Sequence, residues 1–413
     1  MKIEIIGLGY VGYPLALQAA SKGHEVFGVD KNTSLIEQIK LGKSPVTSDA
    51  HIESLQEKVK LEVGVNVESS DVFIVCVPTP VTRKSLPDLS FVIKAVEDIS
   101  RVLEDDNLIV IESTIYPGVC DDIVAPILNR TGKRYLLAHC PERINPGDKY
   151  WNVSNIPRVV GGNTEIATKE ATNLYKEIID ADITPLSQLK AAEATKILEN
   201  TFRDINIAFI NEMAQSFYRL GINVKEVIKG ASTKPFAFMP HFPGLGVGGH
   251  CIAVDPYYMI EKGKEVGFDH DFLALARKIN TKMPSFSVDV IQDGLNDLSM
   301  CLKGTNITVL GLSYKPNVRD DRESPSYEVI ELLKKKGAVV NVYDPFFLEK
   351  SDTLTFKEAL FLADCVLLAT AHDEFVRNIN EFKGIKLLVD GRNALNSLDV
   401  EQLGILYKGI GIA

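Results

Sequence analysis

The sequence predicts an α/β protein in which two doubly wound domains are joined by a long central helix. A strand, a glycine-rich turn, a helix and a second strand follow one another within the first thirty residues, and a similar unit begins near residue 306. Between them, residues 190–219 contain neither glycine nor proline and show helical apolar periodicity. We therefore expect three regions, at residues 1–185, 186–300 and 301–413.

Composition excludes several classes of protein. The 413 residues carry 45 Lys and Arg against 55 Asp and Glu without a basic block, which argues against nucleic-acid binding. No apolar run approaches the ~18–20 residues of a membrane span, and no leader-like segment precedes the first strand. The six cysteines are scattered without a CxxC pair, so we expect reduced thiols, no metal site and a cytoplasmic location.

The N-terminal unit has the context that a dinucleotide-binding site requires. Residues 3–6 read as a strand, Gly-Leu-Gly-Tyr-Val-Gly occupies 7–12, a helix follows at 14–22, and a strand at 25–29 ends in Asp30. This is the pattern of a Rossmann-like domain, in which pyrophosphate binds at the N-terminus of the helix. A glycine-rich turn without a ligand is the plainer alternative.

Each residue of the turn has an expected role. Gly7 allows the tight turn, Gly9 lets the pyrophosphate approach the backbone, and Gly12 lets helix and strand pack closely. Asp30 is expected to accept hydrogen bonds from the adenosine ribose and to repel a 2′-phosphate, which favours NAD over NADP.

Three further strands end in polar motifs. Residues 71–77, 108–112 and 135–140 read as strands, and ligands bind beyond the carboxyl ends of parallel strands. The polar residues that follow them are Thr79, Thr114, Glu142 and Arg143. Glu142 is a candidate general base, and Thr114 a residue that positions water or a hydroxyl group.

The long helix is expected to bridge the domains and to carry a dimer interface, although a plain core helix is the alternative. On it, Lys196 and Asn200 are one turn apart and share a face. A lysine and an amide on one face can stabilise a developing alkoxide, whereas a solvated face would have no such role.

The most unusual segment is glycine-rich and lies at residues 242–255. Gly244, Gly246, Gly248 and Gly249 fall within six residues, which predicts a loop that approaches a ligand closely. The loop ends at Cys251, four residues before Asp255, so Cys251 is a candidate nucleophile, while the other five cysteines are expected to be structural. His250 is expected to be part of the loop and not catalytic.

The second α/β unit lacks the glycine fingerprint. A strand at 307–312, a helix at 326–335 and a strand at 339–343 repeat the order of the first unit. The intervening turn at 313–322 is basic, and it contains Lys315, Arg319 and Arg322. We expect these side chains to hold the ligand of a second nucleotide-binding-like domain.

Together these motifs resemble the UDP-glucose/GDP-mannose dehydrogenase family over essentially the whole chain. The matching motifs occur in the family's order, and they are Gly7 to Gly12 with Asp30, Val77-Pro78-Thr79-Pro80, Glu112-Ser113-Thr114, Pro141-Glu142-Arg143, Lys196 with Asn200, Gly248-Gly249-His250-Cys251 with Asp255, Gly311 to Pro316, and Arg322 to Pro325.

The resemblance implies an NAD-dependent, four-electron oxidation of a sugar C6 alcohol to a carboxylate, with two NAD and one water consumed. Cys251 would form a thiohemiacetal and then a thioester, and Lys196 and Asn200 would stabilise the oxyanions. Asp255 would activate the hydrolytic water, assisted by Thr114 and Glu142.

The resemblance also implies the binding residues. The cofactor would contact the turn, including Tyr10 and Val11, together with Asp30, Thr79, Thr114 and Arg319, although Arg319 could serve either ligand. The UDP-sugar would contact Glu142, Arg143, Lys196, Asn200, Gly244, Gly248, Gly249, Lys315 and Arg322. A homodimer is implied, but a monomer or tetramer stays open, and a uronate product suits synthesis of an acidic surface polysaccharide.

The sugar is indicated by one departure from the family's UDP-glucose members. Those members carry Pro-Glu-Phe-Leu and a second acidic residue before a glycine, whereas this chain has Pro-Glu-Arg-Ile-Asn-Pro-Gly-Asp at 141–148, with Pro146 at the acidic position. This resembles the branch that acts on UDP-N-acetylglucosamine or UDP-N-acetylmannosamine, with the glucosamine epimer slightly favoured. UDP-glucose and, less so, GDP-mannose remain alternatives.

Two other classes of function stay open. A two-electron dehydrogenase of the hydroxyacid type shares the N-terminal fold and a catalytic lysine near an asparagine, but it gives Cys251 no role. A non-catalytic NAD-binding protein would form no NADH with any nucleotide sugar.

Overall fold

The computed structural model describes residues 1–46, 50–80, 87–144, 148 and 150–412, without the side chains of Ala50, His250 and Cys251. The chain divides into two compact units. We call Met1–Glu199 with Tyr257–Asp269 the N-terminal unit, and Asn200–Pro256 with His270–Ala413 the C-terminal unit. Pro146, at which the chain departs from the UDP-glucose pattern, lies outside the described residues.

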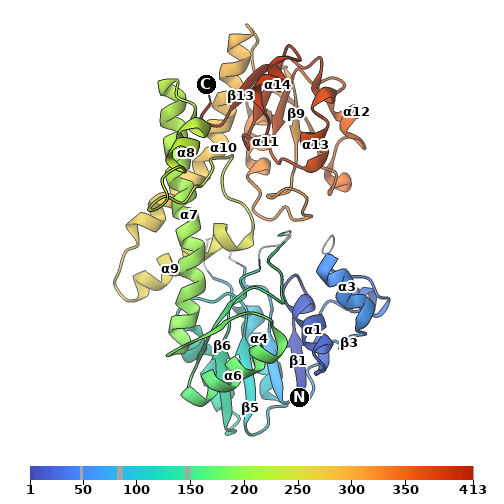
Figure 1. Ribbon diagram of the computed structural model, residues 1–413, viewed down its shortest axis with the longest axis vertical. Coiled ribbons are helices and arrows are strands. Elements are labelled where there is room, and N and C mark those ends of the chain that lie inside the picture. Colours follow the sequence, from blue (N-terminus) through green and yellow to red (C-terminus); the bar gives the residue numbers. More distant parts are fainter. Residues whose placement is uncertain (47–49, 81–86, 145–147, 149, 413) are drawn as a thin grey trace. The chain divides into compact units, whose positions relative to one another are not determined.

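The N-terminal unit is built on an eight-stranded sheet in the order β3-β2-β1-β4-β5-β6-β7-β8 (Figure 1). Neighbouring strands run parallel except β6 and β7, which pair antiparallel. The strands are β1 (Lys2–Ile6), β2 (Glu25–Val29), β3 (Glu62–Gly64), β4 (Val72–Val75), β5 (Asn107–Ile111), β6 (Tyr135–His139), β7 (Arg158–Gly162) and β8 (Ile183–Leu186). The five strands predicted here are confirmed, and β3, β7 and β8 are additional.

Helices cover both faces of this sheet, which is why its central strands are mostly apolar. One face packs against α1 (Gly12–Ser21), α2 (Thr33–Lys40), α3 (Ala50–Lys58) and α6 (Glu165–Ile178). The other packs against α4 (Ser90–Ser100), η1 (Cys120–Val124) and α5 (Ala125–Asn129). Alternation along the strands sends Ile3 and Ile5 to the first face and Ile6 to the second.

The C-terminal unit contains a five-stranded, fully parallel sheet in the order β10-β9-β11-β12-β13 (Figure 1). Its strands are β9 (Asn306–Leu310), β10 (Val339–Tyr343), β11 (Cys365–Leu368), β12 (Leu387–Asp390) and β13 (Leu406–Gly409). The order reverses direction at β9, so the crevice between the loops after β9 and β11 is the expected ligand position. The prediction of two Rossmann-like domains is confirmed.

Helices also cover both faces of the second sheet. One face packs against α8 (Val224–Ala231), α10 (Asp271–Asp297) and α11 (Pro325–Lys335). The other packs against α12 (Phe356–Leu360), α13 (Asp373–Arg377), η3 (Ile379–Phe382) and α14 (Ser397–Glu401), with the short η2 (Leu348–Lys350) nearby in sequence.

The central helix is present as α7 (Leu189–Leu220), which is 32 residues long. A further helix, α9 (His250–Glu265), begins directly after the glycine-rich loop. The loop is therefore shorter than residues 242–255: Cys251 and Asp255 belong to the helix, because the glycines stop at Gly249. Among the helices in the described part of the chain, none is long and apolar enough to cross a membrane.

Candidate active site

The turn between β1 and α1 has the geometry that its three glycines predict. Gly7 has a φ of +96°, and a Cβ there would lie 2.8 Å from the carbonyl of Cys76. A Cβ on Gly12 would lie 1.9 Å from the Gly7 carbonyl oxygen, whereas a Cβ on Gly9 would meet nothing within 4 Å. Gly7 and Gly12 are thus needed by the fold, and Gly9 faces open space, as the predicted approach of a pyrophosphate to the backbone requires.

The acid that ends the second strand is held beside this turn. Asp30 accepts hydrogen bonds from the backbone N–H of Leu8, at 2.9 Å, and of Asn32, at 2.8 Å. Its side chain is half-buried, so it keeps a surface on which ribose hydroxyls can bind. Tyr10 and Val11 lie in the turn that leads into α1.

The polar residues after β4, β5 and β6 lie at the same edge of the parallel part of the sheet. Thr79 is buried, and its carbonyl accepts a hydrogen bond from the Tyr258 hydroxyl of α9. Thr114 is half-buried and follows Ser113, whose hydroxyl donates to the Val77 carbonyl at 2.7 Å. The strand ends are thus tied to one another around the space beyond the sheet.

Glu142 and Lys196 form a buried pair at this edge. The Lys196 ammonium donates to the Glu142 backbone carbonyl and lies 3.9 Å from the carboxylate oxygen Oε2. Both residues are less than a tenth exposed. Burial raises the pKa of Glu142, and the positive charges of Lys196 and Arg158 partly oppose that rise. Lys196 therefore does not lie on a solvated helix face, and Glu142 has the raised proton affinity of a general base.

A second buried ion pair, which the sequence reasoning did not single out, lies behind Glu142. Arg158, the first residue of β7, is 3.0 Å from the carboxylate of Glu112 at the end of β5, and neither side chain is exposed. The Tyr175 hydroxyl also donates to Glu112. A charged residue beginning an otherwise apolar strand was the available signal for Arg158. Arg143, predicted to bind substrate, forms an ion pair with Glu199 at 2.6 Å.

Helix α7 carries a row of buried polar residues at helical spacing, which we call the polar row: Glu193, Lys196, Asn200, Asp204 and Asn211. Within each unit, every residue of the row binds a specific partner. The Glu193 carboxylate accepts from the backbone N–H groups of Gly118, at 2.6 Å, and Cys120, at 2.9 Å.

In the C-terminal unit the row continues with Asn200, whose amide donates to the Asp255 carboxylate at 2.6 Å. Asp204 pairs with Arg277 at 2.7 Å, and Asn211 accepts from the N–H of Gly244 at 3.0 Å. Sequence reasoning found Lys196 and Asn200 but missed the other three positions, whose spacings of three, four and seven residues along the row were the available signal.

The structure brings Asn200 to Asp255, and both are buried. Cys251 lies one helical turn before Asp255, in the first turn of α9, and its side chain is outside the described part of the structure. The predicted nucleophile and the predicted water-activating carboxylate thus come from positions four residues apart in the same helix.

The glycine-rich loop is packed against the loop after β9. Gly249 has a φ of +82° and donates its N–H to the Arg322 carbonyl at 2.9 Å. A Cβ on Gly249 would lie 2.9 Å from the Tyr314 ring, and one on Gly248 would lie 2.8 Å from the Glu323 carbonyl oxygen. Glycine is required at both positions because the two loops touch through their backbones.

The predicted cations of the C-terminal unit differ in their surroundings. Arg322 is half-exposed, and its guanidinium donates two hydrogen bonds to the two carboxylate oxygens of Asp320, at 2.8 and 2.6 Å. Arg319 pairs with Glu349 at 2.5 Å, and Lys315 is half-buried. To bind a diphosphate, the Arg322 guanidinium would therefore have to give up its contact with the Asp320 carboxylate.

A fourth cation, Arg392, was missed in the sequence. It follows β12, and its guanidinium donates to the carbonyls of Ala369, at 2.7 Å, and Tyr314, at 3.4 Å. A Cβ on Gly244 would lie 3.1 Å from this guanidinium, and burial lowers the pKa of Arg392 to about 10. An Asp-Gly-Arg-Asn turn after a strand is an available but weak signal.

These features define a class: an enzyme with a dinucleotide site on one Rossmann-like sheet, a second nucleotide-binding-like sheet, and buried acid–base and amide groups on a shared helix. Among the residues that the structure describes, no group of three or more His, Cys, Asp or Glu side chains is arranged to hold a metal ion.

Comparison with known proteins identifies the family within this class. The chain matches the NAD binding domain of the UDP-glucose/GDP-mannose dehydrogenase family at residues 1–179, the central domain at 190–282 and the UDP binding domain at 308–397. It is 35% identical to UDP-N-acetyl-D-mannosamine dehydrogenase of Pyrococcus horikoshii, with 100% of this chain and 99% of that protein covered.

Two further comparisons agree. UDP-N-acetyl-D-glucosamine 6-dehydrogenase of Pseudomonas aeruginosa is 36% identical, with 91% of each chain covered. The solved structure of a UDP-D-ManNAc dehydrogenase from Pyrococcus horikoshii superposes with a TM-score of 0.91 at 33% identity, covering 100% of this chain and 99% of that one. The chain therefore belongs to the UDP-glucose/GDP-mannose dehydrogenase family and is an NAD-dependent nucleotide-sugar dehydrogenase.

Proposed function

We propose that the protein oxidises the C6 alcohol of a UDP-N-acetylhexosamine, UDP-N-acetylmannosamine or UDP-N-acetylglucosamine, to the uronate. The arrangement of α7 carries this proposal: Lys196 pairs with the base Glu142, and one turn later Asn200 pairs with Asp255, which is one turn beyond Cys251. Relatives of nearly equal length named for both acetylated sugars, and the Pro-Glu-Arg sequence at 141–143, support the choice of sugar.

NAD would be held by the Gly7–Gly12 turn, the N-terminal end of α1 and Asp30, with Thr79 and Thr114 beyond the strand ends. When bound, it accepts a hydride from C6 in each of the two oxidations. The open space over Gly9 and the half-buried carboxylate of Asp30 fit a pyrophosphate and a ribose without a 2′-phosphate.

In the first oxidation the C6 hydroxyl must lose a proton as the hydride leaves. Glu142 can accept that proton, and the Lys196 ammonium stabilises the oxygen on which negative charge develops. The product of this step is an aldehyde at C6.

In the second stage the Cys251 thiolate adds to the aldehyde carbon, and the oxygen takes up a proton to give a thiohemiacetal. Loss of a hydride and that proton from the thiohemiacetal leaves a thioester, with Asn200 and Lys196 stabilising the oxyanion. Asp255 and Glu142 then assist the attack of water, which releases the carboxylate and regenerates the Cys251 thiolate. The balance is one alcohol, one water and two NAD converted to one carboxylate, two NADH and three protons.

The UDP moiety would bind in the C-terminal unit, along Gly244–Gly249 and against Lys315 and Arg322. Arg392, whose guanidinium lies beside Gly244, adds a fourth cation to this group with Arg319. Arg319 belongs to the C-terminal unit. We therefore assign it to the nucleotide sugar.

We further propose that two copies of the chain associate. Several large apolar side chains of the C-terminal unit are exposed on α7 and on the segment before the glycine-rich loop, namely Phe202, Phe209, Phe236, Met239 and Phe242. A second copy that covers them would remove this apolar surface from water. The reaction would take place in the cytoplasm, where UDP-sugars and NAD are available, and its charged product suits an acidic surface polysaccharide.

The choice of sugar is tested by comparing kcat/KM for UDP-N-acetylmannosamine, UDP-N-acetylglucosamine and UDP-glucose with the purified protein. We expect an acetylated sugar to exceed UDP-glucose by at least about tenfold. A preference for UDP-glucose of the same size would replace the proposed substrate with the alternative one.

A further inference from the structure

The same type of contact occurs within each of the two sheets, and the sequence alone does not reveal it. In the N-terminal unit Asp30 accepts from the N–H of Leu8, directly after Gly7, at 2.9 Å. In the C-terminal unit Asp344, at the corresponding end of β10, accepts from the N–H of Leu312, directly after Gly311, at 2.6 Å. The acid at the end of the second strand therefore holds the turn after the first strand in both units.

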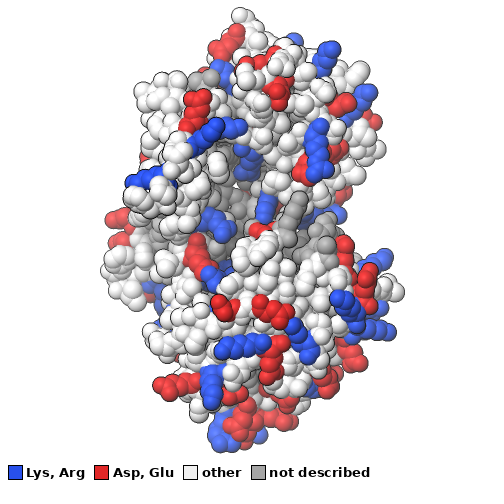
Figure 2. Space-filling model, in the orientation of Figure 1, with Lys and Arg blue, Asp and Glu red and all other residues white. Residues whose placement is uncertain are grey.

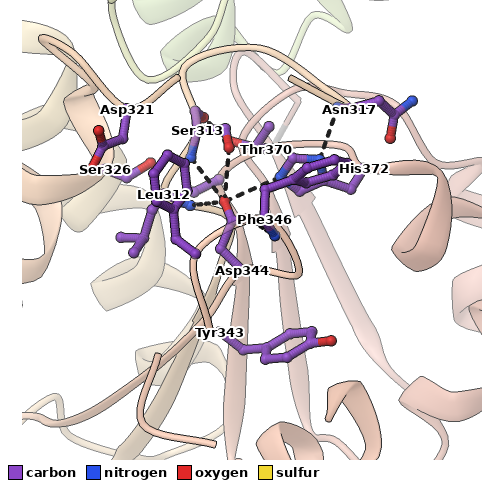
Figure 3. Close-up of polar contacts among 12 residues, drawn as sticks. Leu312, Ser313, Asn317, Asp321, Ser326, Tyr343, Asp344, Phe346, Thr370 and His372 are labelled. Carbon is purple, nitrogen blue, oxygen red and sulfur yellow. Dashed lines mark hydrogen bonds and ion pairs between the residues drawn. The ribbon is translucent and has the colours of Figure 1, made fainter. Parts of the chain in front are cut away.

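Asp30 and Asp344 differ in how far their side chains are exposed and in the groups that they bind. Asp30 is half-buried, whereas Asp344 is not exposed at all. The same Asp344 oxygen also accepts from the N–H and hydroxyl of Ser313, at 2.9 and 3.1 Å, and contacts Nε2 of His372 at 3.2 Å (Figure 3). Although burial raises the pKa of Asp344, these donors and His372 lower it to about 2. Asp344 thus has no surface for ribose hydroxyls and holds protein groups instead.

His372 lies at the switch point of the second sheet, in the loop after β11. It is buried, and its ring centroid lies 5.0 Å from that of Phe346 and 5.5 Å from that of Phe375. Its Nδ1 accepts the backbone N–H of Asn317 at 2.9 Å, so Nε2 carries the ring proton and donates it to Asp344 (Figure 3). Both ring nitrogens are therefore used, in one tautomer.

Asn317, whose N–H binds His372, lies in the loop that carries the proposed substrate cations. Asn317 has a φ of +59°, and its side-chain oxygen accepts the N–H of Asp373 at 3.0 Å. It follows Lys315 by two residues and precedes Arg319 by two. The same loop accepts the N–H of Gly249 through the Arg322 carbonyl, at 2.9 Å. A shift at Asn317 would thus move the cations and the support of the glycine-rich loop together.

We propose that His372 is a positioning residue: held by Asp344, it fixes Asn317 and so shapes the 313–322 loop for binding the UDP moiety. The proposal rests on the function proposed above. It does not make His372 a catalytic residue, since it acts through the loop. Its specific content is that the Nδ1 contact to Asn317, and not the volume of the ring, determines affinity for UDP.

Two substitutions separate these possibilities. In H372N the side-chain amide reaches about as far as Nδ1 of the histidine, so its oxygen can accept a hydrogen bond from the Asn317 N–H. In H372Q the amide reaches about as far as Nε2, so it keeps only the hydrogen bond that it donates to Asp344. Gln fills more of the ring's volume than Asn. If His372 only fills space, H372Q should be the milder change; if it holds Asn317, H372N should be the milder one.

The experiment is calorimetric titration of the full-length protein with UDP and, separately, with NAD. We expect UDP affinity to fall at least about tenfold in H372Q but less than about threefold in H372N, with NAD affinity within about twofold in both. The KM for the nucleotide sugar should follow the same order, while the KM for NAD should not. Equal UDP affinity in H372Q and the wild type, or greater loss in H372N, would overturn the proposal.

Three controls keep the outcomes distinct. K315A tests the proposed substrate site itself: if the wild type binds no UDP, or K315A binds it unchanged, the proposed function fails and not the role of His372. F382L removes buried volume from the same unit, and at equal destabilisation it should leave UDP affinity unchanged. If H372Q does not fold, H372L, which fills much of the ring's volume but cannot accept from the Asn317 N–H, should weaken UDP at least about threefold, and wild-type affinity would contradict the proposal.

Discussion

Single residues in this protein show how burial changes acid–base chemistry. Burial raises the pKa of Glu142, and the nearby Lys196 and Arg158 partly reverse the rise. The carboxylate is therefore able to hold a proton at one stage and release it at another. The same physical cause raises the pKa of Glu4, which lies in β1 away from the strand ends.

Substitution E142Q should trap the covalent intermediate. Gln keeps the shape but cannot accept a proton, so we expect kcat for the alcohol to fall at least about a hundredfold, and we expect the Cys251 thioester to accumulate once the first oxidation is bypassed. Intact-protein mass spectrometry after mixing with the C6 aldehyde of the nucleotide sugar and NAD would detect the adduct. C251S, treated in the same way, should show none; an adduct in C251S, or none in E142Q at comparable loss of kcat, would contradict the assigned roles.

Substitution E4Q should change the pH dependence of stability. Burial raises the pKa of Glu4 to about 7, above its ordinary 4.5, so the folded state binds the proton more tightly than the unfolded chain. Stability is therefore lost as pH rises from about 4.5 through 7, by at most about 3 kcal/mol. In urea unfolding, E4Q should gain stability relative to wild type at pH 8 and little at pH 5. An equal difference in stability between E4Q and the wild type at pH 5 and at pH 8 would contradict this prediction.

At the scale of elements, α7 carries Lys196 and Asn200, two of the groups assigned to the proposed chemistry. Its polar row places Glu193, Lys196, Asn200, Asp204 and Asn211 at buried positions, each with a partner on another segment. A polar group is buried at low cost only when it is hydrogen-bonded, so each pair fixes one neighbouring segment against the helix. The helix is therefore more than a connection between the two sheets.

The glycine-rich loop gives a test at this scale. Gly249 and Gly221 both have positive φ values, +82° and +69°, but only a Cβ on Gly249 would meet another side chain, that of Tyr314. Both G249A and G221A should lose about 1 kcal/mol of stability from backbone strain. Only G249A should also lose kcat/KM for the nucleotide sugar, by at least about tenfold. Equal kinetic effects of the two would show that contact with Tyr314 is unimportant.

The exposed apolar side chains of α7 test the proposed dimer. A carboxylate in place of Phe209, which is 56% exposed, should be hard to bury in an interface, so F209D should shift the protein to monomer in light scattering. F361D is the matched control, since Phe361 is 84% exposed elsewhere in the C-terminal unit. If the wild type is a dimer and F209D has the same molar mass, the proposed interface is wrong. If the wild type itself is a monomer, the proposed dimer is excluded.

At the scale of the whole molecule, two sheets with related orders carry different ligand chemistry. The first keeps an open glycine turn and an accessible acid, while the second covers its acid with His372 and carries cations in the loops after β9 and β12. The charges of the molecule are otherwise mixed: on the face drawn in Figure 2, Lys and Arg side chains alternate with Asp and Glu.

Much of this could be predicted from the sequence because glycine spacing and apolar periodicity are local. The turn at Gly7–Gly12, the strand ends and the helix at 189–220 follow from neighbouring residues alone. The contacts of Arg158, Arg392 and His372 could not be predicted that way, because their partners Glu112, Tyr314 and Asn317 are distant in sequence. The helical start of α9 was missed because the glycines before it dominated the local pattern.

The central claim is a four-electron oxidation through Cys251, and the most direct test is the amount of NADH formed per mole of limiting UDP-N-acetyl sugar. We predict two moles from the wild type with the better of the two acetylated sugars, since the thioester stage requires a second hydride transfer. C251S should form no uronate. A yield of one mole from the wild type would mean that oxidation stops at the aldehyde or at a ketone, and the covalent role of Cys251 would be contradicted.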